Sequence, residues 1–200
     1  MKTLHIIIIS FLAFTLVVSC SKEVTEPTNT NNARSTTISN LPADTGKTGH
    51  FTFFRLSDSS IVSLADSNTT KWDLGFASTT IIVNSGVRGP GQGAAIVMRQ
   101  TDFNSVTEAP ETGWVTETQL APPAIPTGSD NGWYHYEGAT MTITPVPGVV
   151  LLIRTADGKY AKMQVISYYK DAPQVIDPNG QTRMYTFKYV YQPDGTKKFQ

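Results

Sequence analysis

The sequence predicts an all-β protein, with a mostly antiparallel sheet, long loops and little helix. Three observations support this fold class. Short apolar or β-branched runs recur along the chain, and Asp-Gly and Asn-Gly pairs separate several of them. No segment keeps a helical spacing of apolar residues for more than a few turns. Runs of this kind joined by tight glycine-containing turns are typical of antiparallel strands.

Four strands are expected in the first half of the domain. The first contains an aromatic run, and the second alternates apolar with polar or small residues. The third is β-branched, and the fourth is a short apolar run. In that order they are Phe51–Phe54, Lys71–Phe76, Thr80–Val83 and Ala94–Met98.

The stretch Gly86–Gly93, between the last two of these runs, is rich in glycine. A phosphate-binding loop is one interpretation, but the Lys-Ser/Thr pair that follows such a loop is missing. Pro90 also lacks the amide N–H that a phosphate would accept. We therefore expect a glycine-rich connection between two strands.

The second half of the domain begins with Val149–Ile153, a run of five aliphatic residues that is typical of a central strand. Asp157-Gly158 follows, and Tyr160–Tyr169 comes next. An Asp-Gly pair between two such runs is a strong hairpin signal. Asn179-Gly180 predicts a further turn before a strand over Arg183–Gln192.

The strand predicted over Arg183–Gln192 carries large side chains on both faces. Because the large side chains on both faces must be buried by other parts of the protein, this strand should lie inside the sheet. Asp194-Gly195 then predicts a turn into a last short strand, Lys197–Phe199. One face holds Tyr185, Phe187, Tyr189 and Tyr191, and the other holds Met184, Thr186, Lys188 and Val190.

A single hydrophobic core is expected between these strands. The proline-rich stretch Ala121–Pro126 predicts an exposed loop outside it. The residues predicted to share the core are Trp72, Phe76, Ile153, Val165 and Phe187.

The N-terminus has the features of a bacterial lipoprotein precursor. Lys2 precedes an apolar run over Ile6–Val18, which is about as long as a signal-peptide core and short for a membrane span. An aliphatic residue at position −3 and Ser19 at −1 then precede Cys20, as in the lipobox read by lipoprotein signal peptidase. We expect cleavage after residues 1–19 and acylation of Cys20, the single cysteine in the chain, with fatty acids such as palmitate.

Residues 20–46 are expected to form the lipidated N-terminus and a flexible tether. They are rich in Thr, Asn, Ser and Pro, and bury too little apolar surface to offset the entropy of ordering. The folded domain is expected over residues 47–200. Because no aspartate follows Cys20, we expect a lipid anchor in the outer membrane, on its periplasmic face or at the cell surface.

Composition argues against several classes of function. The chain has 16 basic and 16 acidic residues, and only Lys2 falls within the signal peptide, so the mature chain has no electrostatic attraction for nucleic acid. His50 and His135 lie in different segments without a metal-binding spacing. Glu108 and Glu111 are expected to be solvated loop carboxylates. We therefore predict that the protein is not an enzyme.

Four stretches of the sequence, taken together, resemble the HmuY family of haem-binding lipoproteins from Gram-negative bacteria. Their order and approximate spacing agree with that family over most of residues 50–199. The stretches are Lys71–Phe76 (KWDLGF), Asn84–Gly86 (NSG) with the glycine run to Gly93, Arg154–Lys162 (RTADGKYAK) and Tyr185–Tyr189 (YTFKY).

The resemblance implies a mostly antiparallel β fold in a lipid-anchored protein. It also implies that haem is the cofactor, taken from host haemoproteins and passed to a TonB-dependent outer-membrane receptor. Family members hold haem iron between two axial side chains, a histidine pair in some and a methionine pair in others. The second of these lies a little after a Gly-Trp pair, here Gly132-Trp133.

Three residues are candidates for the axial ligands. His135 and Met141 are the donors close to Gly132-Trp133. The first ligand should precede Gly132, but residues 104–131 contain no histidine or methionine, so Met98 on a neighbouring strand is the other candidate. Flat apolar surface for the macrocycle would come from Trp133, Tyr134 and Tyr136.

The spacing of the donors limits how they can act together. His135 and Met141 are six residues apart, or about 20 Å along an extended strand, whereas two axial donors lie about 4–5 Å apart across one iron. Both can bind only if the segment folds back, which Gly138 would permit. Met98 and Met163 are alternatively core residues, and His135 a strand histidine.

Two functions therefore remain open from the sequence. One is a haem-binding lipoprotein that works with an outer-membrane receptor. The other is a cofactor-free surface lipoprotein that binds a protein, a glycan or another ligand on the same scaffold.

Overall fold

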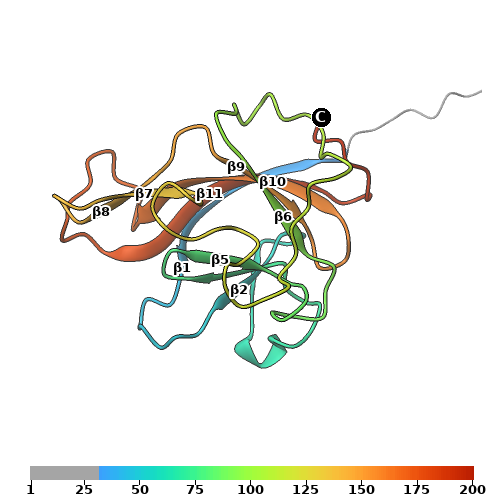
Figure 1. Ribbon diagram of the computed structural model, residues 1–200, viewed down its shortest axis with the longest axis horizontal. Helices are drawn as coiled ribbons and strands as arrows, with labels where there is room; N and C mark the ends of the chain where they lie inside the picture. The colour runs from blue at the N-terminus through green and yellow to red at the C-terminus, as the bar shows by residue number, and fades with distance from the viewer. Residues whose placement is uncertain (1–31) are drawn as a thin grey trace, which may run out of the picture. The chain divides into compact units, whose positions relative to one another are not determined.

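The computed structural model describes residues 32–200 of the chain, and this part is built almost entirely of antiparallel strands (Figure 1). The expected all-β fold is confirmed. Within residues 32–200 the one helix is the short 3-10 helix η1 (Leu64–Asp66), where Ser63 Oγ accepts a hydrogen bond from the Ala65 N–H at 3.3 Å. Among residues 32–200, no helix has the length and apolar character to cross a membrane.

The strands form two larger sheets and a separate hairpin. A five-stranded sheet has the order β1-β11-β10-β9-β6, a four-stranded sheet has the order β3-β2-β4-β5, and β7 pairs with β8. Their bounds are β1 (Arg34–Pro42), β2 (Thr52–Arg55), β3 (Ser60–Val62), β4 (Leu74–Ala77), β5 (Thr80–Val83), β6 (Ala94–Met98), β7 (Tyr134–Glu137), β8 (Thr142–Pro145), β9 (Val150–Arg154), β10 (Tyr160–Tyr169) and β11 (Thr182–Gln192).

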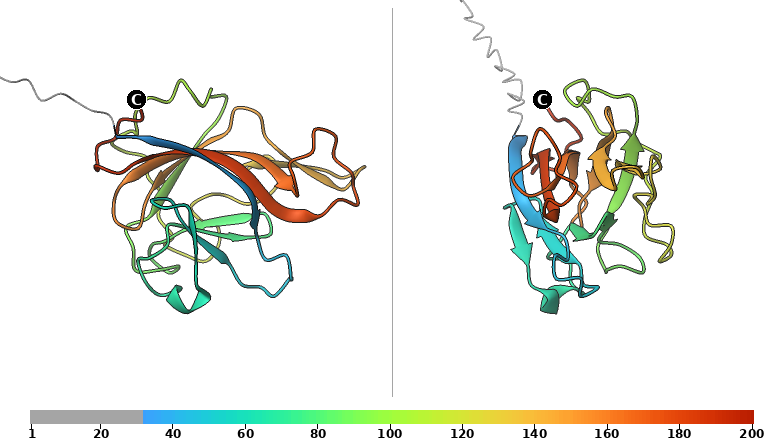
Figure 2. Two further views of the ribbon diagram at one scale, coloured as in Figure 1. Left: turned by 180° about the vertical axis from the view of Figure 1, so that it is seen from behind. Right: turned by 90° about the vertical axis from the view of Figure 1, so that its left-hand side faces the viewer.

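The two larger sheets stack face to face and enclose the main core, which we call the inner core (Figure 2). Its side chains come from alternate positions of the strands, since alternate residues of a strand point to opposite faces. Phe54, Phe76 and Phe187 meet there, with ring centroids 5.6 Å apart for both Phe54–Phe187 and Phe76–Phe187. The predicted core positions Phe76, Ile153, Val165 and Phe187 are all part of it.

Strand β11 lies inside the five-stranded sheet, between β1 and β10, as predicted. Its Tyr185, Phe187 and Tyr189 side chains enter the inner core. Val190 points to the opposite face of the sheet. There it joins a second cluster, the outer cluster, whose buried residues are Phe103, Val106, Ala109, Val150, Leu152, Val190 and Phe199.

Trp72 does not belong to the inner core, which corrects the sequence prediction. It is fully buried, but it packs with Phe53 and Ile82 on the far face of the four-stranded sheet. Its ring centroid lies 4.4 Å from that of Phe53, and its indole N–H donates to the Ser67 carbonyl at 2.9 Å. Trp72 lies two residues before Leu74, the first residue of β4. Because Trp72 is outside the strand, the alternation of strand side chains does not determine which face of the sheet it packs against.

The folded part begins earlier than residue 47. Strand β1 pairs antiparallel with β11 from Arg34↔Tyr191 to Pro42↔Met184, so the predicted flexible tether does not hold for residues 34–42. β1 is an edge strand that buries only Leu41 fully, and its polar composition therefore resembles that of a tether. Signal peptide residues 1–19, Cys20 and the first part of the tether lie outside the described residues.

Two further local predictions need correction. Lys197–Phe199 makes one bridge, Glu108↔Lys198, with a loop instead of adding a strand to a sheet. The stretch Ala121–Pro126 is a loop, as predicted, but Ala124 and Ile125 are 4% and 1% exposed. Ala121 and Pro122 are exposed, and the buried part is attached to the Glu117 carboxylate, which accepts the Ala124 N–H at 3.1 Å.

Candidate functional site

The β7–β8 hairpin carries most of the candidate haem-binding residues. Its register runs from Tyr134↔Pro145 to Glu137↔Thr142, and residues 138–141 form the turn. The chain therefore folds back after Glu137. The Ile143 N–H donates to the Tyr169 hydroxyl at 3.0 Å and so attaches the hairpin to the domain, and the Val146 N–H donates to the Trp133 carbonyl at 2.8 Å at the base of the hairpin.

Trp133 lies in the inner core and offers no free face to a macrocycle. It is 2% exposed, and its ring centroid is 5.1 Å from that of Tyr185 and 6.0 Å from that of Tyr168. Its indole N–H donates to the Thr79 carbonyl at 2.9 Å. Trp133 is therefore better described as the residue that anchors the hairpin than as a wall of a haem pocket.

The two tyrosines of β7 share the face opposite to that of His135, because side chains alternate along a strand. Tyr134 is partly buried against the inner core, with its ring centroid 5.2 Å from that of Trp133. Tyr136, nearer the tip, is 45% exposed. Of the three aromatic candidates, Tyr136 thus has the most ring surface open to a ligand.

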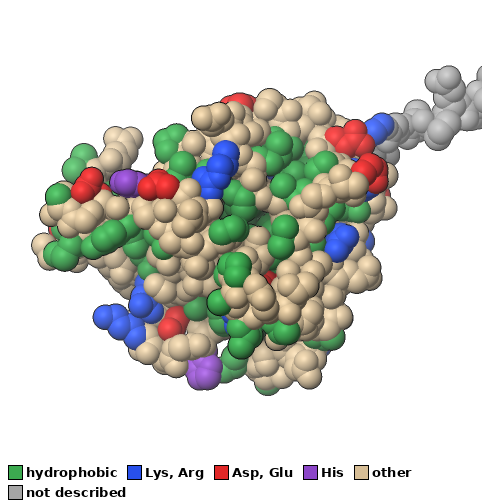
Figure 3. Space-filling view, in the orientation of Figure 1, with side chains coloured by type: hydrophobic (Ala, Val, Ile, Leu, Met, Phe, Trp, Pro, Cys, Tyr) green, Lys and Arg blue, Asp and Glu red, His purple; other side chains and the backbone are tan. Residues whose placement is uncertain are grey.

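His135 is held by a carboxylate from the loop before the hairpin. Its Nδ1 lies 2.9 Å from Asp130 Oδ2 and 3.1 Å from Asp130 Oδ1, and its side chain is 46% exposed. The hydrogen bond from His135 lowers the pKa of the Asp130 carboxyl below its ordinary value. Over β7 and β8, the space-filling view shows a histidine at the surface with acidic side chains on either side (Figure 3).

Met141 lies at the tip of the hairpin. It has a positive φ of 55° in the turn and is 71% exposed. His135 pairs with Thr144, and Met141 lies three residues before Thr144. The two donors are therefore about 10 Å apart along the hairpin. The fold-back therefore shortens the distance between the two donors but does not place them on opposite sides of one iron.

Met98 faces a different part of the molecule. On β6, Ala95 and Val97 point to the inner core, whereas Met98 packs against the outer cluster on the other face of the sheet. Trp133, Tyr134 and Ile143 all contact the inner core. Met98 is therefore held by packing with the outer cluster, whereas His135 is held by Asp130 and Met141 lies in the hairpin turn. Met163, fully buried in the inner core, is a core residue as the sequence suggested.

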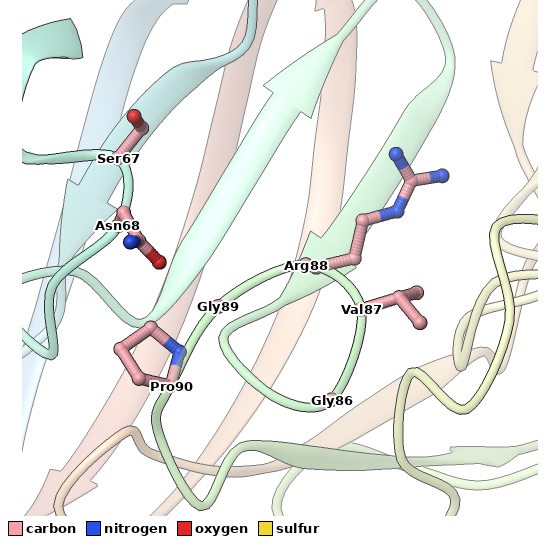
Figure 4. Close-up of a pocket in the computed structure, with 7 residues that line it drawn as sticks. All are labelled: Ser67, Asn68, Gly86, Val87, Arg88, Gly89 and Pro90. Carbon is pink, nitrogen blue, oxygen red and sulfur yellow. The ribbon is translucent and has the colours of Figure 1, made fainter.

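A surface cavity of about 380 Å³ lies elsewhere, at the glycine-rich connection between β5 and β6. Ser67 and Asn68 form one side, and the loop Gly86–Pro90 forms the other (Figure 4). The Arg88 side chain extends away from Ser67 and Asn68 (Figure 4). It donates to the Leu120 carbonyl at 2.8 Å and lies 5.6 Å from the Phe51 ring centroid. No histidine or methionine lines this cavity.

The sequence comparison decides the family. Residues 47–148 match the family model of the HmuY protein. The chain belongs to the HmuY family. No curated protein matches it in sequence.

Solved structures share the HmuY-like fold at low sequence identity. An apo HmuY analogue from Tannerella forsythia has a TM-score of 0.52 and 17% identity, covering 80% of this chain and 96% of its own. A proposed HmuY-like haem-binding protein from Bacteroides vulgatus has a TM-score of 0.50 and 17% identity, covering 81% and 93%. A proposed lipoprotein from Bacteroides fragilis has a TM-score of 0.51 and 16% identity, covering 82% and 93%.

Three of the four HmuY-like stretches meet at one structural junction. The Asp73 carboxylate accepts the Ala156 N–H at 2.9 Å, and the Asn84 amide donates to the Trp72 carbonyl at 2.8 Å. A Cβ at Gly91 would lie 2.7 Å from the Asn84 carbonyl oxygen and 2.8 Å from the Ala156 Cβ, so glycine is required there. These motifs therefore hold the two sheets together, and none of them contains a candidate ligand.

Sequence reasoning missed Asp130 as part of the site. Its partner, His135, lies five residues away, and Asp130 precedes the strand in a loop. The signal was present as an Asp-Asn-Gly turn directly before an aromatic strand, because aspartate in such a turn can fold its carboxylate back toward the strand.

Proposed function

We propose that this HmuY-family protein is an outer-membrane lipoprotein that binds haem and passes it to a TonB-dependent receptor. The HmuY family consists of binding and transport proteins and includes haem-binding members. The observation that carries the proposal is the β7–β8 hairpin, which presents an imidazole and a thioether at the surface, in the segment where the family resemblance predicts a ligand. Haem is then a cargo, and a host haemoprotein its source.

The donors on the hairpin fit haem one at a time. His135 Nε2 forms no hydrogen bond with the described residues, and the Met141 thioether is exposed. Because the two lie about 10 Å apart along the hairpin, either can serve as an axial ligand beside the exposed Tyr136 ring, but both cannot bind the same iron. A thioether raises the reduction potential of haem iron, so ligation by Met141 would favour ferrous haem.

The position of the hairpin suits a lipid-anchored carrier. The chain enters the domain at β1, where Arg34 pairs with Tyr191, close to the first residue of β10. The hairpin is attached at the other end of β10, through Tyr169. Ten strand residues separate these ends by about 30 Å. A tether from an acylated Cys20 would leave the hairpin open to soluble haem carriers.

Titration of the purified domain with haemin tests the proposal. A saturable change in the Soret band, under oxidising or reducing conditions, is expected for the wild type. Met141→Ala should weaken the ferrous complex and change its spectrum, and His135→Ala should weaken the ferric complex. The matched control is Ile61→Ala, which replaces an exposed apolar residue on β3 of the four-stranded sheet. This variant should bind haemin as the wild type does. Binding that survives loss of both His135 and Met141 would show that other residues bind the iron.

A cofactor-free binding function is the second candidate, and the cavity at Gly86–Pro90 favours it. Its polar side chains, Ser67 and Asn68, suit hydroxyl or amide groups of a glycan or peptide better than haem. If the wild type showed no saturable haemin binding in either oxidation state, this second function would replace the first. Calorimetric titration with soluble glycans should then detect binding that Asn68→Ala removes.

A further inference from the structure

We infer that Asp130 is a positioning residue that fixes His135 as a single imidazole donor for haem iron, with Nε2 as the donor atom. This inference rests on the proposed haem binding and adds the residue that orients the ligand. Under this inference the ring of His135 is already oriented in the haem-free protein, whereas the side chain of Met141 is not.

The geometry defines which nitrogen of His135 carries the proton. Nδ1 lies within hydrogen-bond distance of both Asp130 carboxylate oxygens, at 2.9 and 3.1 Å. A carboxylate only accepts hydrogen bonds, so Nδ1 must be the donor. In a neutral imidazole the lone pair then lies on Nε2, and Nε2 has no hydrogen-bond partner among residues 32–200. The free nitrogen is the one that can bind a metal.

Asp130 is itself held in place before any ligand binds. Its N–H donates to the Tyr134 carbonyl at 2.8 Å, and the Ser129 hydroxyl donates to its carboxylate at 3.0 Å. The Tyr136 N–H donates to the same Ser129 hydroxyl at 2.9 Å. The Arg99 guanidinium, from the residue after β6, donates to the carbonyls of Asn131 and Gly132. The loop thus places its carboxylate against the side of β7 that carries His135.

This arrangement matches the usual environment of a metal-binding histidine. Such histidines donate their second ring N–H to a carboxylate or carbonyl, which fixes the ring orientation and makes the other nitrogen more basic. A more basic imidazole stabilises ferric iron, in contrast to a thioether. A polar contact between two exposed side chains contributes little to folding stability, so stability alone gives small reason for this hydrogen bond.

The tautomer of His135 can be measured in the haem-free protein. Long-range ¹H–¹⁵N correlation spectra at a pH where the ring is neutral should show a protonated Nδ1 and an unprotonated Nε2 in the wild type. Asp130→Ala should shift the ring toward the Nε2–H tautomer, which is the commoner one in water. A wild-type ring protonated on Nε2 would overturn the inference, whatever the protein binds.

Haemin binding supplies the second test. Asp130→Ala should weaken ferric haemin binding by about 10- to 100-fold, as loss of such a partner does at other metal sites, and should raise the reduction potential of bound haem. Asp130→Asn keeps an acceptor oxygen without the charge, and should recover part of the affinity but not the potential. Asp66→Ala removes another surface ion pair, with Lys71, and should leave both unchanged.

The outcomes separate this inference from the proposed function. If the wild type binds haemin and Asp130→Ala binds it with the same affinity, spectrum and potential, the role of Asp130 is overturned while haem binding stands. Unchanged binding by His135→Ala overturns it as well. If the wild type does not bind haemin, the proposed function fails, and this role fails with it.

Discussion

The Ala156 N–H donates a hydrogen bond of 2.9 Å to the Asp73 carboxylate, across 83 residues of chain. Asp73 precedes β4 of the four-stranded sheet, and Ala156 lies in the turn between β9 and β10 of the five-stranded sheet. The second carboxylate oxygen of Asp73 accepts the Leu56 N–H at 2.8 Å. One buried side chain therefore joins three segments, which explains why the Lys71–Phe76 and Arg154–Lys162 stretches occur together.

Replacing Asp73 with alanine should lower the free energy of unfolding by about 2–6 kcal/mol. Each buried N–H left without an acceptor costs about 1–3 kcal/mol, and two would be left here. Chemical denaturation measures the change. Asp66→Ala, which breaks an exposed ion pair, should cost about 1 kcal/mol or less. Equal effects of the two substitutions would contradict the role assigned to Asp73.

Glu117 should make the stability of the protein depend on pH. Burial raises the pKa of its carboxyl above the ordinary 4.5, although the Val83 and Ala124 N–H groups oppose the rise. The folded state therefore binds this proton more tightly than the unfolded state does. The resulting stabilisation is full below about pH 4.5 and is lost as the pH rises through the folded-state pKa.

The measurement compares wild type with Glu117→Gln by urea denaturation from pH 4 to 7. The difference in unfolding free energy, wild type minus variant, should fall as the pH rises. A difference that grows with pH would mean that the carboxylate is stabilised in the folded state.

Truncating Phe187 to alanine should destabilise the domain by about 3–5 kcal/mol, because its ring is fully buried between Phe54 and Phe76. Met163→Ala, at another fully buried position, should cost about 2–5 kcal/mol and affect stability far more than haemin binding. Ile166→Ala, at a position 44% exposed on β10, should change stability by about 0.5 kcal/mol. Thermal denaturation ranks the three variants, and a Phe187 effect as small as that of Ile166 would contradict the packing.

Replacing Cys20 with serine should abolish acylation, and a serine variant from which residues 1–19 have been removed should no longer be held at membranes. Acylation requires the cysteine thiol, and no other segment of the sequence after residue 20 is apolar enough to serve as an anchor. Cell fractionation followed by a carbonate wash tests this expectation. A variant that still sediments with membranes after the wash would show that the lipid is not the sole anchor.

The local pattern of the sequence determined most of the strands. β5 (Thr80–Val83), β6 (Ala94–Met98) and β10 (Tyr160–Tyr169) coincide with their predicted ranges, and the Asp157-Gly158 hairpin is present. Alternation and turn chemistry act over a few residues, so they can be read from the chain directly. β1 was missed because an edge strand needs little apolar surface, and its stability comes from main-chain bonds to β11.

Which residues gather at the candidate site was decided by the tertiary structure. The sequence by itself indicated the family, the segment after Gly132-Trp133 and the candidate donors His135, Met141 and Met98, since these depend on residue type and order. It could not show that Met98 packs against the outer cluster, or that the Trp133 side chain is buried in the inner core. Those outcomes depend on which face of a strand meets which sheet, and that is set by packing between segments far apart in the chain. The contact between Asp130 and His135 likewise exists because the loop closes against β7.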